Sequence, residues 1–435
     1  MVIYLKHGGK DMYNFKTKSL GKYDVVVCGG GIAGIGAALS AARNGASTVI
    51  IESYGALGGT ATVGLMGGIM DAKSKGGMIK ELMTFLHERE LILTHNGPRF
   101  DENGKKIPGK MYDIEYAKYF FEKVLKEAGV KILYNSSVCG VDHTDGHINK
   151  IMITTYCGNY EIEGKIYIDA TGNGNLSELC DLKWECGNPP NPASFGVTLS
   201  GFDPSFYGTD TEEDKAKYAE LLAENNIHTS NEHICLRILP NLREWCFGYN
   251  FEYNVFPDDI ERFSEAVIHG RQEGFETVEA LRNVEGFENI QINKSVEYLG
   301  VREGRRFFGL YRLTNEDIIA GTKFEDGICP VESTVDVHKL HENDTHELQR
   351  GVKTQPYEIP YRCLVPVGSD NLLLAGRMIS GDFYPFASYR MIANMGTVGE
   401  AAGYAAAKCV EKGIAPAAVD GKEVKTYMKS LGHKL

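Results

Sequence analysis

The sequence lacks the cysteine spacings that are typical of metal-binding and redox sites. Ten cysteines are scattered through 435 residues, none forms a C-x-x-C pair, and the closest two are Cys180 and Cys186. This excludes the usual zinc-ribbon, iron–sulfur and thioredoxin-like spacings, so we expect no metal site. Scattered cysteines in so long a chain, with lysines and no apolar run in the first 22 residues, favour a reduced cytoplasmic protein without a signal peptide.

Positive charge is also in short supply. The chain has 46 Lys and Arg against 58 Asp and Glu, a net charge of −12. Because nucleic acids and anionic membranes are bound by clustered basic residues, we expect neither as a partner. The uncharged stretch 25–42 is the one candidate membrane span. It contains five glycines, and a buried strand followed by a buried helix explains it better than a span.

Glycine is the residue in excess, with 50 copies where a typical usage of ~7% predicts roughly 30. Glycine is costly inside regular elements, so an excess indicates tight turns and close backbone approaches. The segment 29–34 (GGGIAG) fits G-x-G-x-x-G. An apolar strand pattern at 23–28 precedes it, a helix pattern at 32–44 follows, and a second strand pattern at 47–51 ends at an acid. This order predicts a β-α-β unit with parallel strands.

That context is the dinucleotide-binding fingerprint, although a glycine turn without a nucleotide stays an alternative. The first glycine permits the turn, the second lets the backbone approach the pyrophosphate, and the third lets the helix pack on the strand. The N-terminus of the helix supplies N–H groups to the phosphates, and the acid accepts hydrogen bonds from ribose. The predicted binding residues are Gly29, Gly31, Ile32, Ala33, Gly34 and Glu52.

The rest of the chain predicts two domains. A helix at 113–128, buried strands at 130–133, 165–169 and 371–375, hairpins between 137 and 163, and a helix at 394–408 complete the first domain. Between about 184 and 355 we expect strands at 233–238, 245–255 and 290–299, a helix near 258–271, and a helix opened by a Thr314–Asp317 capping box. The prediction is an α/β Rossmann-like domain of residues 1–185 and 356–435, with a parallel sheet and a β-meander. Residues 186–355 form an inserted α+β substrate domain.

Five blocks give the sequence a family resemblance. They are YDVVVCGGGIAGIGAA, IIESYGALGGTAT, IYIDATGNGNL, YLGVREGRRFFG and NLLLAGRMISGDFYPFASYRMIANMGTVGEAAGYAAA. With these blocks the chain resembles FAD-dependent oxidoreductases that have a glutathione-reductase-type flavin domain, above all bacterial members of about this length, from residue 23 to about 407. Only one dinucleotide fingerprint is present, and a second glycine turn follows Glu52, which suits a ligand longer than NAD.

The resemblance implies FAD as the cofactor and assigns further contacts to it. Val138 would contact adenine, and the turn at 169–172 would contact the flavin. Gly376 and Arg377 would lie against the ribityl chain. The helix near Asn394 would aim its positive end at the flavin O2/N1 edge, where negative charge develops. The full set of added residues is Gly59, Thr60, Val138, Ala170, Gly172, Gly376, Arg377 and Asn394.

Two departures from the family pattern matter. Relatives that attach FAD covalently use a His or Cys near the second glycine turn, and residues 58–62 have neither, so we expect dissociable FAD. Many relatives also carry a histidine where this chain has Phe386, which makes Tyr384 the local candidate for proton transfer. Arg390, just before the flavin-facing helix, is the candidate that orients the substrate.

Three arginines in five positions, Arg302, Arg305 and Arg306, allow two interpretations. They could bind an anionic substrate, or they could form an inter-domain salt-bridge cluster with Glu303. His338, His341 and His346 have a metal-like spacing, but their charged surroundings favour a solvated loop.

We therefore expect an enzyme that transfers a hydride between a small polar metabolite, which the arginines allow to be anionic, and flavin N5. Arg302, Arg305 and Arg390 are its expected substrate contacts, and Tyr384 and Arg390 its expected catalytic residues. The alternative is a flavoprotein subunit that passes electrons to a partner protein. Flavin-dependent RNA modification is disfavoured by the net charge.

Overall fold

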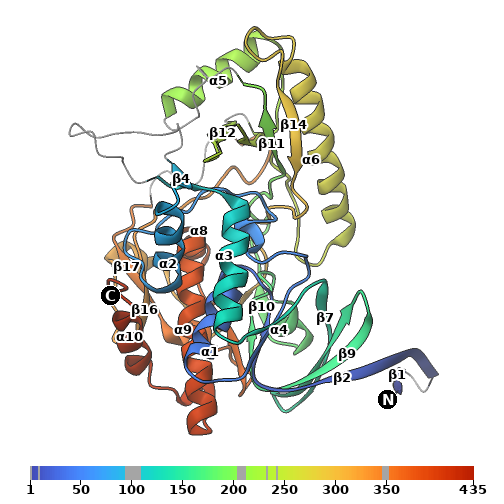
Figure 1. Cartoon of the computed structure of the whole chain (residues 1–435), viewed down its shortest axis with the longest axis vertical. Helices are drawn as coiled ribbons and strands as arrows, with labels where there is room; N and C mark the ends of the chain where they lie inside the picture. The colour runs from blue at the N-terminus through green and yellow to red at the C-terminus, as the bar shows by residue number, and fades with distance from the viewer. Residues whose placement is uncertain are drawn as a thin grey trace.

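The computed structural model describes residues 2–7, 10–93, 109–202, 212–231, 234–241, 243–344 and 352–435. It has two bodies (Figure 1). The lower body is built on a large mixed sheet and contains both termini, and the upper body is built on a smaller sheet from the middle of the chain. Each sheet has its own hydrophobic core. The predicted α/β class is thereby confirmed.

Parallel strands form the centre of the large sheet. Their order is β6 (Lys131–Leu133), β3 (Thr48–Ile51), β2 (Lys10–Cys28), β9 (Gly158–Asp169) and β18 (Leu372–Leu374). Every residue of β3 and β18 is buried, as expected for strands covered on both faces. The helix α1 (Ile32–Arg43) connects β2 to β3, so the predicted β-α-β unit is confirmed.

A β-meander extends the same sheet. The strands β7 (Ser136–Thr144) and β8 (His147–Thr155) continue antiparallel from the first half of β9. The predicted turn at Asp145 and Gly146 is confirmed, and both residues have positive φ angles, 50° and 83°. The second predicted turn is displaced, because Gly158 already pairs with Thr155 and the turn falls on residues 156–157.

The strand β2 begins at residue 10, although the apolar pattern predicts a strand only from Tyr23. Residues 17–19 pair with residues 159–161 of β9, and in this polar part Thr17 is buried between two exposed lysines. The added length therefore comes from pairing and not from an apolar run. The strand β1 (Val2–His7) pairs antiparallel with it.

Two helices of the lower body pack backbone to backbone. The helix α9 (Ile392–Lys412) is buried along most of its length and lies against α1. A Cβ atom on Gly399 would lie 1.9 Å from the carbonyl oxygen of Ala33, and one on Gly403 would lie 2.1 Å from that of Ala37. Only glycine allows this separation, and the N-termini of both helices are fixed relative to each other.

Shorter elements complete the lower body. The helices are α2 (Gly77–His87), α3 (Ile114–Glu127), α4 (Asn175–Leu179), α7 (Asn315–Ala320), α8 (Phe383–Tyr389) and α10 (Gly421–Ser430), with the 3-10 turns η1 (Gly59–Ala61), η2 (Tyr361–Leu364) and η3 (Pro416–Ala418). The paired short strands are β4 (Ile92–Leu93) with β5 (Met111–Tyr112), β10 (Trp184–Glu185) with β15 (Arg306–Phe307), and β16 (Gly327–Val331) with β17 (Tyr357–Pro360). The predicted capping box of Thr314 and Asp317 opens α7.

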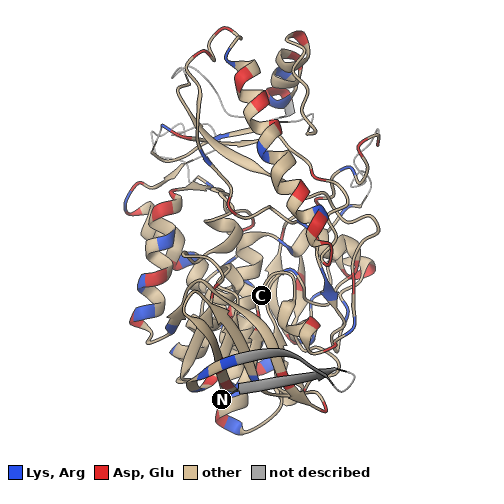
Figure 2. Ribbon diagram, turned by 90° about the vertical axis from the view of Figure 1, so that its right-hand side faces the viewer, with Lys and Arg blue, Asp and Glu red and all other residues tan. Residues whose placement is uncertain are grey.

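The upper body is a four-stranded sheet covered by helices. The strand order is β12 (Cys235–Ile238), β13 (Trp245–Gly248), β11 (Gly196–Ser200) and β14 (Gln291–Ser295). Its strands are shorter than predicted, and His233 lies outside the described residues. The helices are α5 (Glu212–Glu224) and α6 (Ile260–Leu281), and acidic residues outnumber basic ones along α6 (Figure 2).

The two cores bear on the predicted domain limits, which stay a prediction. The core of the upper body runs from Ala193 to Leu299. Ile328, Cys329 and Val331 pack in the core of the lower body, although the predicted boundary assigned them to the insertion. Among the described residues, no helix combines the length and apolar character needed to cross a membrane.

Candidate functional site

The first glycine turn lies where β2 ends and α1 begins. Gly29 has a φ of +105°, and a Cβ atom there would lie 2.3 Å from the carbonyl oxygen of Ala170. A Cβ atom on Gly34 would lie 1.8 Å from the carbonyl oxygen of Gly29. Gly31 differs, since no atom lies within 4 Å of its Cβ position. Gly29 and Gly34 are thus required by the fold, whereas Gly31 faces open space.

The second glycine turn is bonded to the first. The N–H of Gly58 donates to the carbonyl oxygen of Gly30 at 2.8 Å, and Gly31 and Gly58 form a parallel bridge. Gly58 and Gly59 both have positive φ angles. A Cβ atom on Gly59 would lie 3.2 Å from the Cα of Gly31, so the predicted contact at 59–60 lies beside the predicted pyrophosphate contact.

Glu52, the predicted ribose acceptor, is buried at the end of β3. One carboxylate oxygen accepts the N–H of Gly30 at 2.7 Å and the other accepts that of Tyr54 at 2.8 Å. Burial raises the pKa of Glu52, and these N–H groups oppose the rise. The start of β7 is tied to the same place, because the N–H of Ser136 donates to the carbonyl oxygen of Glu52. Val138, the predicted adenine contact, lies two residues further on.

The third turn follows β9 and is held by Asp169. This buried carboxylate accepts the N–H and hydroxyl groups of both Thr171 and Ser177, at 2.7–3.1 Å. Burial raises its pKa, and the same hydrogen bonds oppose the rise. Asp169 therefore shapes the turn that contains Ala170 and Gly172, both predicted cofactor contacts.

Unpartnered polar atoms gather around this turn. The guanidinium of Arg377 lies against Gly172, with Nη1 3.1 Å from the Cβ position there. Nε and Nη2 of Arg377 are buried and have no hydrogen-bond partner among the described residues, and the same holds for Oδ1 of Asn173 and Nε of Arg305. Because buried polar groups are almost always paired, these atoms indicate a missing polar ligand.

The N-terminus of α9 lies in the same region. The helix begins at Ile392, and Asn394 is buried in its first turn. The N–H groups of this first turn have no partner within the helix, so they and the helix dipole can face an anionic group. Gly376, with a φ of +113°, brings its backbone close to α1, where its Cβ position lies 3.6 Å from the Cβ of Ala33. Contacts of Gly376 and Asn394 with the cofactor stay predictions.

The three neighbouring arginines, Arg302, Arg305 and Arg306, make different contacts. Arg306 pairs with Glu303 and Glu185, as the salt-bridge interpretation expects. Arg302 instead donates from Nη1 to the carbonyl oxygen of Pro192 at 2.8 Å and to Oγ of Ser194 at 2.7 Å.

Arg305 donates to the carbonyl oxygen of Asn173 at 3.2 Å. Neither Arg302 nor Arg305 has a carboxylate partner among the described residues. Burial, followed by the charge of Arg390, lowers the pKa of Arg302 to about 10.

Arg390 makes an ion pair that the sequence did not predict. Its Nη2 lies 2.8 Å from Oδ2 of Asp336, and its buried Nε has no partner among the described residues. Burial raises the pKa of Asp336, but nearby cations, with Arg390 first, outweigh that effect and hold it below its ordinary value. Asp336 also lies 3.5 Å from His338.

The prediction of a solvated loop is wrong for His338. Its side chain is 22% exposed, and its ring lies 4.9 Å from that of Phe251. Burial and the charge of Arg302 lower its pKa well below the usual range, so it is neutral. His341 is exposed, and His346 lies outside the described residues. Charged sequence neighbours suggested solvent, but an aromatic ring from the inserted domain covers His338.

Tyr384, the predicted proton donor, lies in the first turn of α8. Its ring packs edge-on against Phe383, with centroids 5.4 Å apart. Among the described residues its hydroxyl has no hydrogen bond, and the ring makes no cation contact with Arg377 or Arg390. Phe386, in the place of the family histidine, is fully buried under the guanidinium of Arg390, 6.0 Å from the ring centroid.

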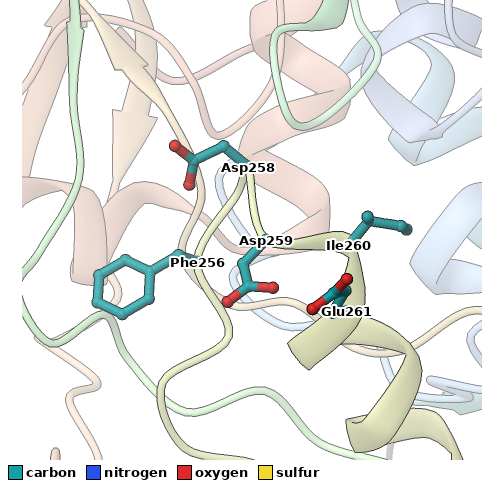
Figure 3. A pocket seen from close by; sticks show the side chains of 5 residues that line it. All are labelled: Phe256, Asp258, Asp259, Ile260 and Glu261. Atoms are coloured by element: carbon teal, nitrogen blue, oxygen red, sulfur yellow. The ribbon is translucent and has the colours of Figure 1, made fainter.

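Two further features contain none of the predicted site residues. An open hollow of about 470 Å³ lies before α6 and is lined by Phe256, Asp258, Asp259, Ile260 and Glu261 (Figure 3). Its acidic lining suits no anion, and no predicted site residue lines it. A second group, Glu252, His269 and Glu273, has ligand atoms within 4.8 Å of one another. Sequence spacing did not reveal that group, and Glu252 is already paired with Arg262 at 2.8 Å.

Sequence comparison identifies the family. A family model described as FAD dependent oxidoreductase matches residues 24–428. Digeranylgeranylglycerophospholipid reductase 2 of Methanothermobacter thermautotrophicus is 29% identical over 154 residues, which are 35% of this chain and 40% of that protein. Digeranylgeranylglycerophospholipid reductase of Methanococcus vannielii is 28% identical over 163 residues, which are 37% of this chain and 41% of that protein. The match thus spans about two fifths of these curated relatives.

Solved structures share the fold. The flavin-dependent halogenase CmlS has a TM-score of 0.51 and 10% identity, over 94% of this chain and 62% of that one. The flavin-dependent brominase Bmp2 has a TM-score of 0.50 and 14% identity, over 94% and 83%. At these identities the likeness concerns the fold alone.

Proposed function

The chain belongs to the family of FAD-dependent oxidoreductases, and we propose that this enzyme, with FAD as its cofactor, transfers a hydride between the flavin and a small polar metabolite at the junction of the two bodies. FAD, when bound, supplies the hydride acceptor or donor.

The residues of the site fit FAD. The open space beside Gly31 and the free N–H groups at the N-terminus of α1 suit a pyrophosphate. The unpartnered guanidinium of Arg377 suits a polar group of the same ligand. We propose that the predicted contacts hold FAD without a covalent bond, because residues 58–62 contain no His or Cys.

The observation that supports a polar substrate is the positive charge of the arginine side chains near the N-terminus of α9. Arg390 lies two residues before this helix with only 9% of its side chain exposed, and the partly buried Arg302 near it has no carboxylate partner among the described residues. Such a guanidinium is costly unless an anionic or strongly polar ligand binds it. In this proposal Arg390 orients the substrate, Arg302 and Arg305 contact it, and Tyr384 moves a proton at its hydroxyl.

Two other functions find less support. The curated relatives are named as reductases of a lipid, but a buried arginine cluster favours a polar substrate over an isoprenoid chain. Transfer of electrons to a partner protein stays an alternative, and no observation on the described residues favours it.

The test is direct. The purified enzyme should be yellow and should release FAD when denatured by heat or acid. Metabolites are then screened anaerobically for their ability to bleach the flavin absorbance. Air or candidate electron acceptors are added to the reduced enzyme, and reoxidation of the flavin is monitored. If a reduced partner protein alone changes the flavin, and no metabolite does, the electron-transfer alternative replaces the proposal.

A further inference from the structure

The inserted sheet turns one face toward the flavin domain. We call this the inner face, and it consists of two rows of directly paired residues that lie side by side. The first row is Arg237, Cys246 and Thr198, and the second row is Cys235, Gly248 and Gly196. Sγ of Cys246 donates to the carbonyl oxygen of Leu65 at 3.3 Å, just after η1. The opposite face, with Leu236, Phe247 and Val197, packs into the upper core.

The glycines of the inner face are not required by the protein itself. Neither Gly196 nor Gly248 has a positive φ. A Cβ atom would lie 3.4 Å from the nearest atom at Gly196 and 3.5 Å at Gly248, which is close to ordinary contact. Glycine weakens a strand, and it often marks a bulge, a bend or a place where a ligand or another backbone approaches closely. The two glycines therefore leave room for a ligand over the neighbouring strands β13 and β11.

Arginines border this row on both sides. Arg237 is in the adjacent row of the inner face, its Nη1 lies 3.9 Å from Sδ of Met66, and its buried Nε has no partner among the described residues. On the other side, Ser194 precedes Gly196 by two residues and accepts a hydrogen bond from Arg302. Arg390 and Asp336 lie next to Arg302, and their charges act on one another.

The charges of this cluster do not balance. Arg237, Arg302 and Arg390 carry three positive charges, and all three act on Asp336, which carries one negative charge. His338 is neutral and adds none. Glu303 also acts on Arg390, but it is already paired with Arg306. An excess of about two positive charges among such partly buried groups is unfavourable until an anion compensates for it.

We propose that the substrate carries two anionic groups, carboxylates or a carboxylate and a phosphate, and lies over Gly196 and Gly248 with one group on Arg302 and Arg390 and the other on Arg237. This proposal rests on the proposed function, because it places the substrate of that same site. It adds Arg237 and the two glycines as residues that determine specificity.

Binding of unreactive anions tests the proposal without turnover. The FAD-loaded oxidised enzyme is titrated with malonate, succinate, glutarate and phosphoglycolate, and with acetate and neutral malonamide. Binding is measured as the heat released in calorimetric titration and as a change in the absorption spectrum of the flavin. We expect one of the dianions to bind at least about 10-fold more tightly than acetate, and malonamide not to bind. The phosphate and carboxylate probes distinguish the two kinds of anion.

Two variants locate the second anionic group. Arg237→Gln should weaken the dianion about 10- to 100-fold and leave acetate unchanged, so that the preference disappears. Gly248→Val should abolish dianion binding, yet keep FAD and an equal or higher melting temperature, because a β-branched residue suits a strand. Arg243→Gln, at an exposed position before β13, is the matched control.

Three results would overturn the proposal. They are equal affinity for acetate and all dianions, an Arg237→Gln enzyme that loses both equally, and a Gly248→Val enzyme with unchanged dianion affinity. Each leaves the proposed function standing if the flavin is still reduced by a metabolite. A protein that contains no FAD would instead overturn the proposed function.

Discussion

A Cβ atom on Gly399 would lie 1.9 Å from the carbonyl oxygen of Ala33, so α9 and α1 meet backbone to backbone. Since the N-terminus of α1 faces the predicted pyrophosphate and that of α9 the predicted flavin edge, this contact sets the distance between two parts of the cofactor site. We therefore expect both stability and cofactor binding to depend on Gly399.

Gly399→Val should therefore destabilise the fold by roughly 3 kcal/mol or more, because the two backbones must separate. Thermal denaturation and the FAD content of the purified protein measure the effect. Glu411→Val places the same side chain on an exposed position of α9 and should cost less than about 1 kcal/mol. Equal melting temperatures for the two variants would contradict the close contact.

Gly31→Val should separate cofactor binding from folding. Its Cβ position has no neighbour within 4 Å, and its φ of −65° suits any residue, so the apoprotein should lose no more than about 1 kcal/mol. FAD affinity should fall roughly 100-fold or more, because the side chain takes the space of the pyrophosphate. Flavin fluorescence titration of apoprotein measures it. A variant that binds FAD normally would remove Gly31 from the site.

Arg377→Met should have opposite effects on the apoprotein and on binding. Two nitrogens of this guanidinium are buried without a partner among the described residues, so the apoprotein should be as stable as the wild type or more stable. FAD affinity should fall about 10- to 100-fold, since a charged hydrogen bond is lost.

Arg306→Met is the contrasting variant. That arginine is buried, and its two terminal nitrogens pair with Glu303 and Glu185, so its loss should destabilise the fold by about 3 kcal/mol or more. If Arg377→Met destabilises the apoprotein as much as Arg306→Met does, Arg377 has a structural partner, and the prediction that it binds FAD is wrong.

Local patterns carried most of what the sequence predicted. The glycine turn, Glu52 and the small-residue helix are contiguous segments, and each follows from the backbone conformation that the segment itself requires. The β2 strand extends further than predicted because Thr17 pairs with a strand more than 140 residues away, which no local pattern encodes.

The substrate side was harder to predict for the same reason. Arg237, Gly196 and Gly248 are brought together only by the register of β11, β12 and β13, and none of them has a sequence neighbour that marks it as a site residue. His338 was misjudged because a distant ring, that of Phe251, covers it. A charged segment predicts exposure only where no other part of the chain packs on it.

The pair of His269 and Glu252 should make stability depend on pH. Nδ1 of His269 lies 2.7 Å from the carboxylate, and this hydrogen bond raises the pKa of His269 above its ordinary value of 6.5. A raised pKa in the folded state stabilises the protein fully below pH 6.5, and the contribution is lost as the pH rises through the raised pKa.

His269→Gln should accordingly lower the melting temperature at pH 5.5 and have little effect at pH 8.5. The difference should be small, because the side chain is more than half exposed and solvent screens the pair. His341→Gln, at an exposed position, should show no such pH dependence. A difference that grows toward alkaline pH would have the wrong sign and would rule out this linkage.

Tyr384→Phe tests the proton-transfer step. The Tyr384 hydroxyl makes no hydrogen bond among the described residues, so its removal should leave the fold and the FAD content unchanged. If Tyr384 moves the proton, the rate of flavin reduction by the substrate found in the screen should fall roughly 100-fold or more, and stopped-flow absorbance measures that rate. Tyr389→Phe is the control, since its buried hydroxyl donates to the carbonyl oxygen of Ile379 at 2.9 Å and its loss should lower stability more than rate. Wild-type kinetics in the Tyr384→Phe enzyme would show that Tyr384 takes no part in the proton transfer.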